Sequence, residues 1–171
     1  MRFHLPLAAL AFIASTASYA DNGTITFSGS VIAAACDIPT PNLDIPMGTV
    51  TQSALPNIGA VAATKSFQIE LTGCPDLSAS GLTTLSVAFS GERDNDNHNL
   101  LSLDESSTAE GIAIGLYEND NTAININNAS KPLTLQQGDI PLQFIAKIVA
   151  TKNSITAGNF TATTDFSITY N

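Results

Sequence analysis

The chain has 171 residues, of which 44% are hydrophobic and only 12% are charged, and its formal net charge at pH 7 is −9. Nucleic acids and anionic membrane surfaces repel so acidic a protein, so neither is expected as a partner. The length suits a single domain, and much of the remaining composition is Thr, Ser, Asn and Gly, which favour strands and turns over helices.

Residues 1–20 have the pattern of a secretory signal peptide. A short basic start precedes the almost wholly apolar residues 5–14, and Ser18 and Ala20 are small residues at the positions that a signal peptidase recognises. The apolar run is too short for a transmembrane helix, which needs about 20 residues. We therefore predict cleavage before Asp21 and export of the rest of the chain.

The two cysteines of the chain, Cys36 and Cys74, agree with export. An oxidising compartment favours a single disulfide between them, which would stabilise the fold by about 4 kcal/mol on a chain-entropy estimate. A structural zinc site takes four Cys or His ligands, so two cysteines predict none. Two buried free thiols are the alternative.

Alternation of apolar and polar residues with a period of two recurs along the chain and predicts strands. Within Gly23–Ala35, one face carries Ile25, Phe27, Gly29 and Val31, and the other carries hydroxyl side chains. Further strands are predicted at residues 65–71, 83–90, 111–117, 123–126, 131–135 and 140–151, with turn residues between them and a single helical turn within 54–64.

The C-terminal segment alternates most strictly, and one row of it consists of Phe160, Ala162, Thr164, Phe166, Ile168 and Tyr170. Seven or more short strands with one disulfide predict an all-β, immunoglobulin-like sandwich.

The strands at the two ends of the exported chain suggest how it functions. The apolar face of the N-terminal strand is an aggregation hazard unless it has a docking site. At the other end, the chain stops one residue after Tyr170, so we expect the sandwich to lack a closing strand and to leave a groove over its core. Both features are explained if the N-terminal strand of one copy fills a groove in the next copy, which builds a head-to-tail fibre. The alternative is an N-terminal strand that folds back and completes its own sandwich.

Three segments together resemble the chaperone–usher pilins, the subunits of type 1-like fimbriae. They are Gly23–Val31 leading into Ala34-Ala35-Cys36, Phe67–Pro75, and the C-terminal strand with Gly158 before it and Tyr170 penultimate. The resemblance implies an incomplete immunoglobulin-like β-sandwich that lacks its final strand. Residues 21–33 would be an N-terminal donor-strand extension, and residues 34–171 would be the pilin domain.

The family's assembly mechanism assigns roles to individual residues. A periplasmic chaperone lends the missing strand first, and the extension of the next subunit replaces it at an outer-membrane usher. The implied donor face is Ile25, Phe27, Gly29 and Val31, with Gly29 at a narrow point of the groove. The implied acceptor groove and chaperone contact consist of Gly158, Phe160, Ala162, Thr164, Phe166, Ile168 and Tyr170.

The resemblance thus implies a structural subunit of a fimbria on the bacterial cell surface, exported through the periplasm and serving cell adhesion. Its expected partners are neighbouring subunits, the chaperone and the usher, and no cofactor is expected. The alternative is a single-domain carbohydrate- or receptor-binding adhesin module. Sugar-binding platforms favour aromatic side chains, and this chain has no Trp and three Tyr.

Catalytic and metal sites find little support in the sequence. The densest polar cluster, residues 92–98, has no recognised spacing of nucleophile, base and orienting group, so we do not expect an enzyme. Asp94, Asp96 and His98 are only distantly similar to a calcium loop, because Asn99 stands where a glycine is expected. No metal site is predicted.

Overall fold

The computed structural model describes residues 24–29 and 36–171, and these belong to two units, which divide the chain between Val31 and Ile32. In the first unit, residues 24–29 belong to no strand or helix, and the side chains of Ile25 and Phe27 are 79% and 91% exposed. The predicted signal peptide and Val31 lie outside the described residues.

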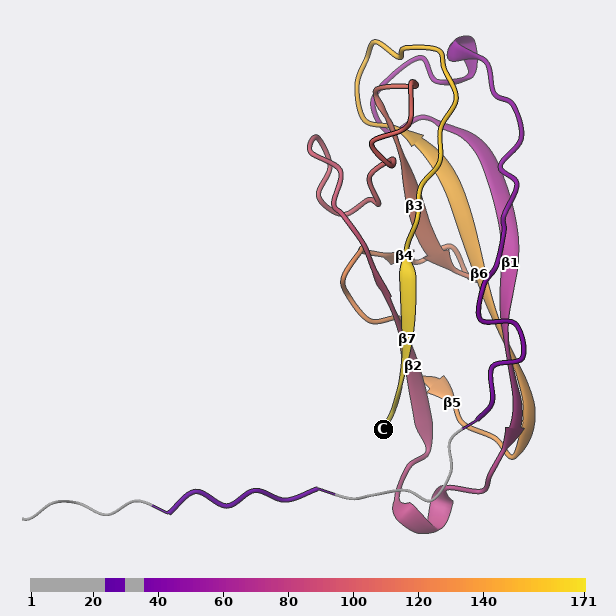
Figure 1. Cartoon of the computed structure of the whole chain (residues 1–171), viewed down its shortest axis with the longest axis vertical. Coiled ribbons are helices and arrows are strands. Elements are labelled where there is room, and N and C mark those ends of the chain that lie inside the picture. Colours follow the sequence, from indigo (N-terminus) through magenta and orange to yellow (C-terminus); the bar gives the residue numbers. More distant parts are fainter. Residues whose placement is uncertain (1–23, 30–35) are drawn as a thin grey trace, which may run out of the picture. The chain divides into compact units, whose positions relative to one another are not determined.

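The second unit is a sandwich of two antiparallel sheets (Figure 1). The larger sheet contains β1 (Val61–Cys74), β6 (Gly138–Ala150), β3 (Ile112–Glu118) and β4 (Ala123–Ile124), in the order β1-β6-β3-β4. Its two longest strands, β1 and β6, pair over most of their length, with Phe67 directly opposite Phe144. β1 is therefore an edge strand of this sheet.

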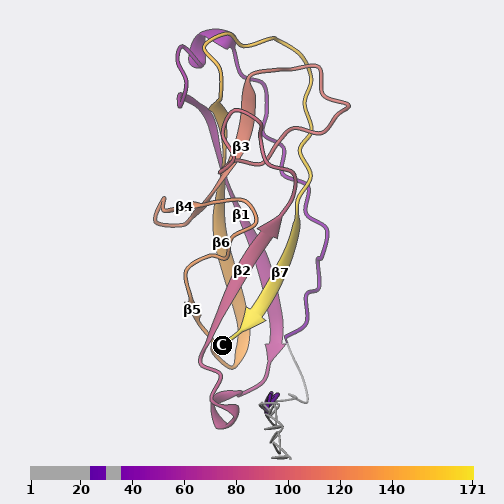
Figure 2. The same ribbon diagram turned by 90° about the vertical axis from the view of Figure 1, so that its left-hand side faces the viewer.

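The smaller sheet contains β5 (Leu133–Thr134), β2 (Thr84–Ser90) and β7 (Asp165–Tyr170), in the order β5-β2-β7. Figure 2 shows β2 and β7 side by side, running antiparallel. The register places residues 85, 87 and 89 of β2 opposite residues 170, 168 and 166 of β7. β7 is the edge strand of this sheet, and among the described residues no strand pairs with its other side.

The core lies between the two sheets and is made by the inward-facing row of each strand. Phe89 from β2 and Phe144 from β6 meet edge to face, with ring centroids 5.1 Å apart. The largest fully buried side chains are Phe89, Phe144, Ile69, Leu71, Leu85, Ile126, Ile148 and Val87. Period-two alternation produces this arrangement because successive side chains of a strand point to opposite faces of its sheet.

The structure confirms the all-β sandwich and changes the bounds of several predicted elements. Regular pairing begins at Asp165 rather than near residue 160, because its partner strand β2 ends at Ser90. β1 begins at Val61, and the helical turn near it is a 3-10 turn, η1 (Gln52–Ala54); a second 3-10 turn is η2 (Ser78–Ser80). Within the described ranges, no helix combines the length and apolar composition that crossing a membrane requires.

Candidate functional site

The inward-facing residues of β7 are only half-buried, although their neighbours on β2 are fully buried. Val87 is 0% exposed and Phe89 is 2% exposed, whereas Ile168 and Phe166, which lie opposite them, are both half-buried. Directly opposite residues of an antiparallel pair share one face of the sheet. The difference in burial therefore comes from the uncovered side of β7.

The other sheet has a matching feature at its edge strand. Phe67 of β1 is half-buried, whereas its partner Phe144 on β6 is 0% exposed. The Phe67 ring lies 5.8 Å from that of Phe144 and 6.2 Å from that of Phe89. Phe67 thus belongs to the aromatic centre of the core while keeping one side open.

Residues 36–50 run along the β1 side of the sandwich, as Figure 1 shows in dark purple. They belong to no strand, although Asp37 and Thr72 exchange two backbone hydrogen bonds of 2.9 Å. Four of these residues are half-buried against the core, namely Cys36, Ile38, Met47 and Val50. This side of the sandwich is therefore lined by apolar side chains that the chain itself covers only in part.

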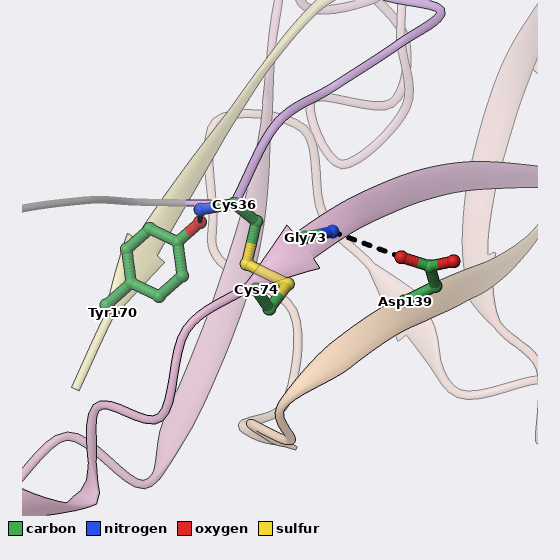
Figure 3. The surroundings of a disulfide bond; sticks show 5 residues. All are labelled: Cys36, Gly73, Cys74, Asp139 and Tyr170. Carbon is green, nitrogen blue, oxygen red and sulfur yellow. Dashed lines mark hydrogen bonds between the residues drawn. A yellow bond between two sulfur atoms is a disulfide. The ribbon is translucent and has the colours of Figure 1, made fainter.

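Cys36 and Cys74 form a disulfide, which ties the start of this segment to the end of β1 (Figure 3). The backbone N–H of Cys36 donates a hydrogen bond to Tyr170 Oη over 3.2 Å. The penultimate side chain therefore joins the end of β7 to the disulfide. Close by, the N–H of Gly73 donates to Asp139 Oδ1 over 3.1 Å.

The remaining residues of the predicted acceptor row precede β7. Phe160, Ala162 and Thr164 are half-buried, and the two apolar ones pack against the core. Gly158 lies so close to the loop at residues 108–109 that a Cβ added to it would overlap the carbonyl carbon of Thr108. The even-numbered residues from Phe160 to Tyr170 are thus all half-buried, whereas Gly158 is exposed and lies against the loop.

Phe67 and the half-buried residues of segment 36–50 also line this site, although the sequence did not predict them as members of it. Phe67 falls within the strand predicted at residues 65–71, but alternation does not distinguish a residue that is fully covered from one that is half-open. On the donor side, Ile25, Phe27 and Gly29 are described and exposed, and no atom comes within 4 Å of a Cβ added to Gly29.

The loop that distantly resembles a calcium site is closed by its own hydrogen bonds. Asp94 Oδ1 accepts from the N–H groups of Asp96 and Asn97 over 3.1 and 2.8 Å, and Lys152 Nζ lies 3.4 Å from Asp96 Oδ2. Among the described residues, no three His, Cys, Asp or Glu side chains gather as a metal site would. We find no arrangement here that coordinates an ion.

Comparison with known proteins identifies the family. Residues 25–171 match the sequence model of the family described as fimbrial protein. Long polar fimbria protein A of Salmonella typhimurium is 34% identical over 169 residues, which cover 96% of this chain and 93% of that protein.

Solved structures agree with this sequence match. A subunit in the structure of a chaperone–usher pilus superposes with a TM-score of 0.67 at 25% identity, over 92% of this chain and 100% of that one. The P pilus rod subunit PapA has the same fold, with a TM-score of 0.69 at 24% identity over 81% of this chain and 100% of that one. The sandwich is therefore of the immunoglobulin-like pilin type, and the chain belongs to the fimbrial protein family of chaperone–usher pilins.

Proposed function

We propose that this chain is a structural fimbrial subunit that accepts a strand along the open side of β7 and lends its own residues 21–33 to a neighbouring subunit. The observation that carries the proposal is the half-burial of Phe166, Ile168 and Tyr170 beside fully buried partners on β2. A strand laid along the open edge would cover these side chains and pair with the free backbone groups of β7.

The donor segment carries apolar, exposed side chains of the kind that the open side of β7 would cover. Ile25 and Phe27 are apolar and exposed, and burying Ile25, Phe27 and Val31 would contribute about 1.5–3 kcal/mol for each side chain. Ordering the segment opposes this by about 1–2 kcal/mol per residue. Ordering the 13 residues opposes donation by more than the three side chains contribute, and hydrogen bonds along the strand add about 1 kcal/mol each, so the persistence of the assembled fibre rests mainly on the kinetic barrier to withdrawing a buried strand.

The direction of assembly follows from the geometry of donation. Donor and acceptor are different parts of the same chain, so each contact is head-to-tail and the polymer is an open fibre. In the proposed order, a periplasmic chaperone occupies the open edge first, and the extension of the next subunit replaces it at the outer-membrane usher. The product is a fimbria on the cell surface that serves adhesion, and the proposal assigns the chain no reaction and no cofactor.

The donor role is tested by assembly in cells that express the chaperone and usher. Deletion of residues 21–31 should abolish insertion into a neighbour while leaving chaperone binding intact, because the acceptor edge is untouched. Gly29→Leu should slow exchange, because a filled groove resists a bulky side chain. Ser28→Leu is the matched control, since it adds the same side chain to the opposite face of the donor strand. Unimpaired fibre formation by both the deletion and Gly29→Leu would contradict the proposal.

A further inference from the structure

The open edge of β7 continues beyond the end of its regular strand. Phe160 and Ala162 are half-buried against the core, whereas Asn159, Thr161 and Thr163 are exposed. This is the same alternation as in β7, although β2 has already ended and provides no backbone partner for these residues. Some other part of the chain must hold residues 159–163 extended.

The loop at residues 104–109 performs this task with a series of hydrogen bonds. The N–H and hydroxyl of Thr163 donate to Asp104 Oδ1 and Oδ2, each over 3.0 Å. The N–H of Thr161 donates to Ser107 Oγ over 3.0 Å, and its carbonyl accepts from the N–H of Asp104 over 2.8 Å.

The far end of the segment is held in the same way. The N–H of Asn159 donates to Thr108 Oγ1 over 2.9 Å, and its carbonyl accepts from the N–H groups of Thr108 and Ala109 over 2.8 and 3.1 Å. The missing side chain of Gly158 allows this close approach, because a Cβ there would overlap the Thr108 backbone. The loop therefore imitates a β-ladder, with a carboxylate and two hydroxyls in place of some backbone acceptors.

The hydrogen bonds from the loop all go to residues 159, 161 and 163. The backbone groups of residues 160 and 162 therefore point to the other side of the segment, which is the open one. Asn171 and Thr84 exchange two backbone hydrogen bonds of 2.8 and 2.9 Å, so they are a hydrogen-bonded pair of the β2–β7 ladder. Such pairs alternate with non-hydrogen-bonded ones along an antiparallel ladder, so residues 166 and 168 direct their N–H groups away from β2. Among the described residues, no hydrogen bond uses the backbone of Phe160 or Ala162. The even-numbered residues from Phe160 to Tyr170 thus present one continuous row of backbone groups that have no partner within the described part of the chain.

We propose that Asp104, Ser107 and Thr108 are positioning residues that make residues 159–163 the second half of the strand-accepting edge. The inference rests on the proposed function and adds to it a second support for the acceptor. Length supports it: the donor segment of residues 21–33 has 13 residues, whereas β7 has six. A donor strand in full contact must therefore extend onto the segment that this loop holds.

The test uses the full chain, separated from the periplasmic chaperone that would otherwise cover the same edge and then mixed with a synthetic peptide of residues 21–33. Amide hydrogen exchange is measured before and after peptide capture. In the unaltered chain, capture should slow exchange at Phe160 and Ala162 as well as at Phe166 and Ile168. In Asp104→Ala, protection at Phe160 and Ala162 should fall about three- to tenfold, as expected for a lost hydrogen bond, while the two β7 amides keep theirs.

Two control variants separate positioning from general stability. Asp104→Asn can still accept from the Thr163 N–H and donate to its hydroxyl, so it should retain protection at all four amides. Asp94→Ala removes another loop carboxylate that accepts two backbone N–H groups, and it should change none of the four.

Two results for Asp104→Ala would overturn the inference: unchanged protection at all four amides, or an equal fall at all four, which would indicate a purely structural role. Capture of the peptide with protection confined to β7 in the unaltered chain would also overturn it, while leaving the proposed function standing. If the unaltered chain captured no peptide at all, the proposed function would fail, and this inference with it.

Discussion

The strongest quantitative prediction concerns Ile168→Ala, because the structure supplies its own control on the neighbouring strand. Ile168 on β7 is half-buried, and its register partner Val87 on β2 is 0% exposed. Truncating a fully buried Ile to Ala lowers the free energy of unfolding by about 2–5 kcal/mol, so truncating a partly covered one should lower it by less. If a donor strand covers Ile168, the full loss of stability should appear only when the donor strand is bound.

The assay is guanidinium unfolding of the full chain, with and without a saturating peptide of residues 21–33. Ile168→Ala should lower the free energy of unfolding by about 2–5 kcal/mol with peptide and by a smaller amount without it. Val87→Ala should lower it equally in both conditions, since Val87 is already buried. An equal loss of unfolding free energy in Ile168→Ala with and without peptide would refute the reasoning that a donor strand covers the open side of β7.

Three further predictions concern residues outside the apolar row. Replacing Cys36 and Cys74 by Ala should lower the free energy of unfolding by about 4 kcal/mol and reduce the yield of chaperone-bound subunit; a yield equal to that of the unaltered chain would argue against a structural bridge. Gly158→Ala should cost about 1–3 kcal/mol through overpacking against the facing loop, measured by thermal unfolding, and an unchanged melting temperature would disprove the close approach. The pKa of Asp120 is lowered mainly by the hydrogen bond from Lys131 Nζ, so this carboxylate should stabilise the fold above about pH 4 and lose that contribution only as the pH falls further. In an NMR titration, Lys131→Met should raise the pKa of Asp120. An unchanged Asp120 pKa in this variant would exclude the ion pair as the cause.

The strands themselves were largely predictable from the sequence. The alternation within 83–90, 140–151 and 160–170 identified β2, β6 and β7, because a strand that covers a core must place apolar residues on one face only. The disulfide could be predicted because an exported chain with two cysteines favours a single bridge. These features depend on local sequence or on composition, so one chain without relatives is enough to infer them.

The strand bounds were less predictable, since pairing depends on a partner strand from another part of the sequence. The alternation of residues 160–164 looks the same as that of β7, yet it is supported by a loop some 55 residues earlier rather than by β2. Residues 24–29 alternate just as clearly and form no strand within their own unit. Alternation indicates which side of a segment is apolar, but it does not specify the partner that pairs with its backbone.

By itself, then, the sequence determined the all-β class, the bridge and the apolar row that ends at Tyr170. Only the tertiary structure decided that this row is half-open, that Phe67 shares the open side and that loop 104–109 supports its upstream half. The physical reason is that burial and pairing are properties of two surfaces brought together. The polarity of a side chain is known from its own position in the sequence, whereas the surface that covers it is contributed by residues far along the chain.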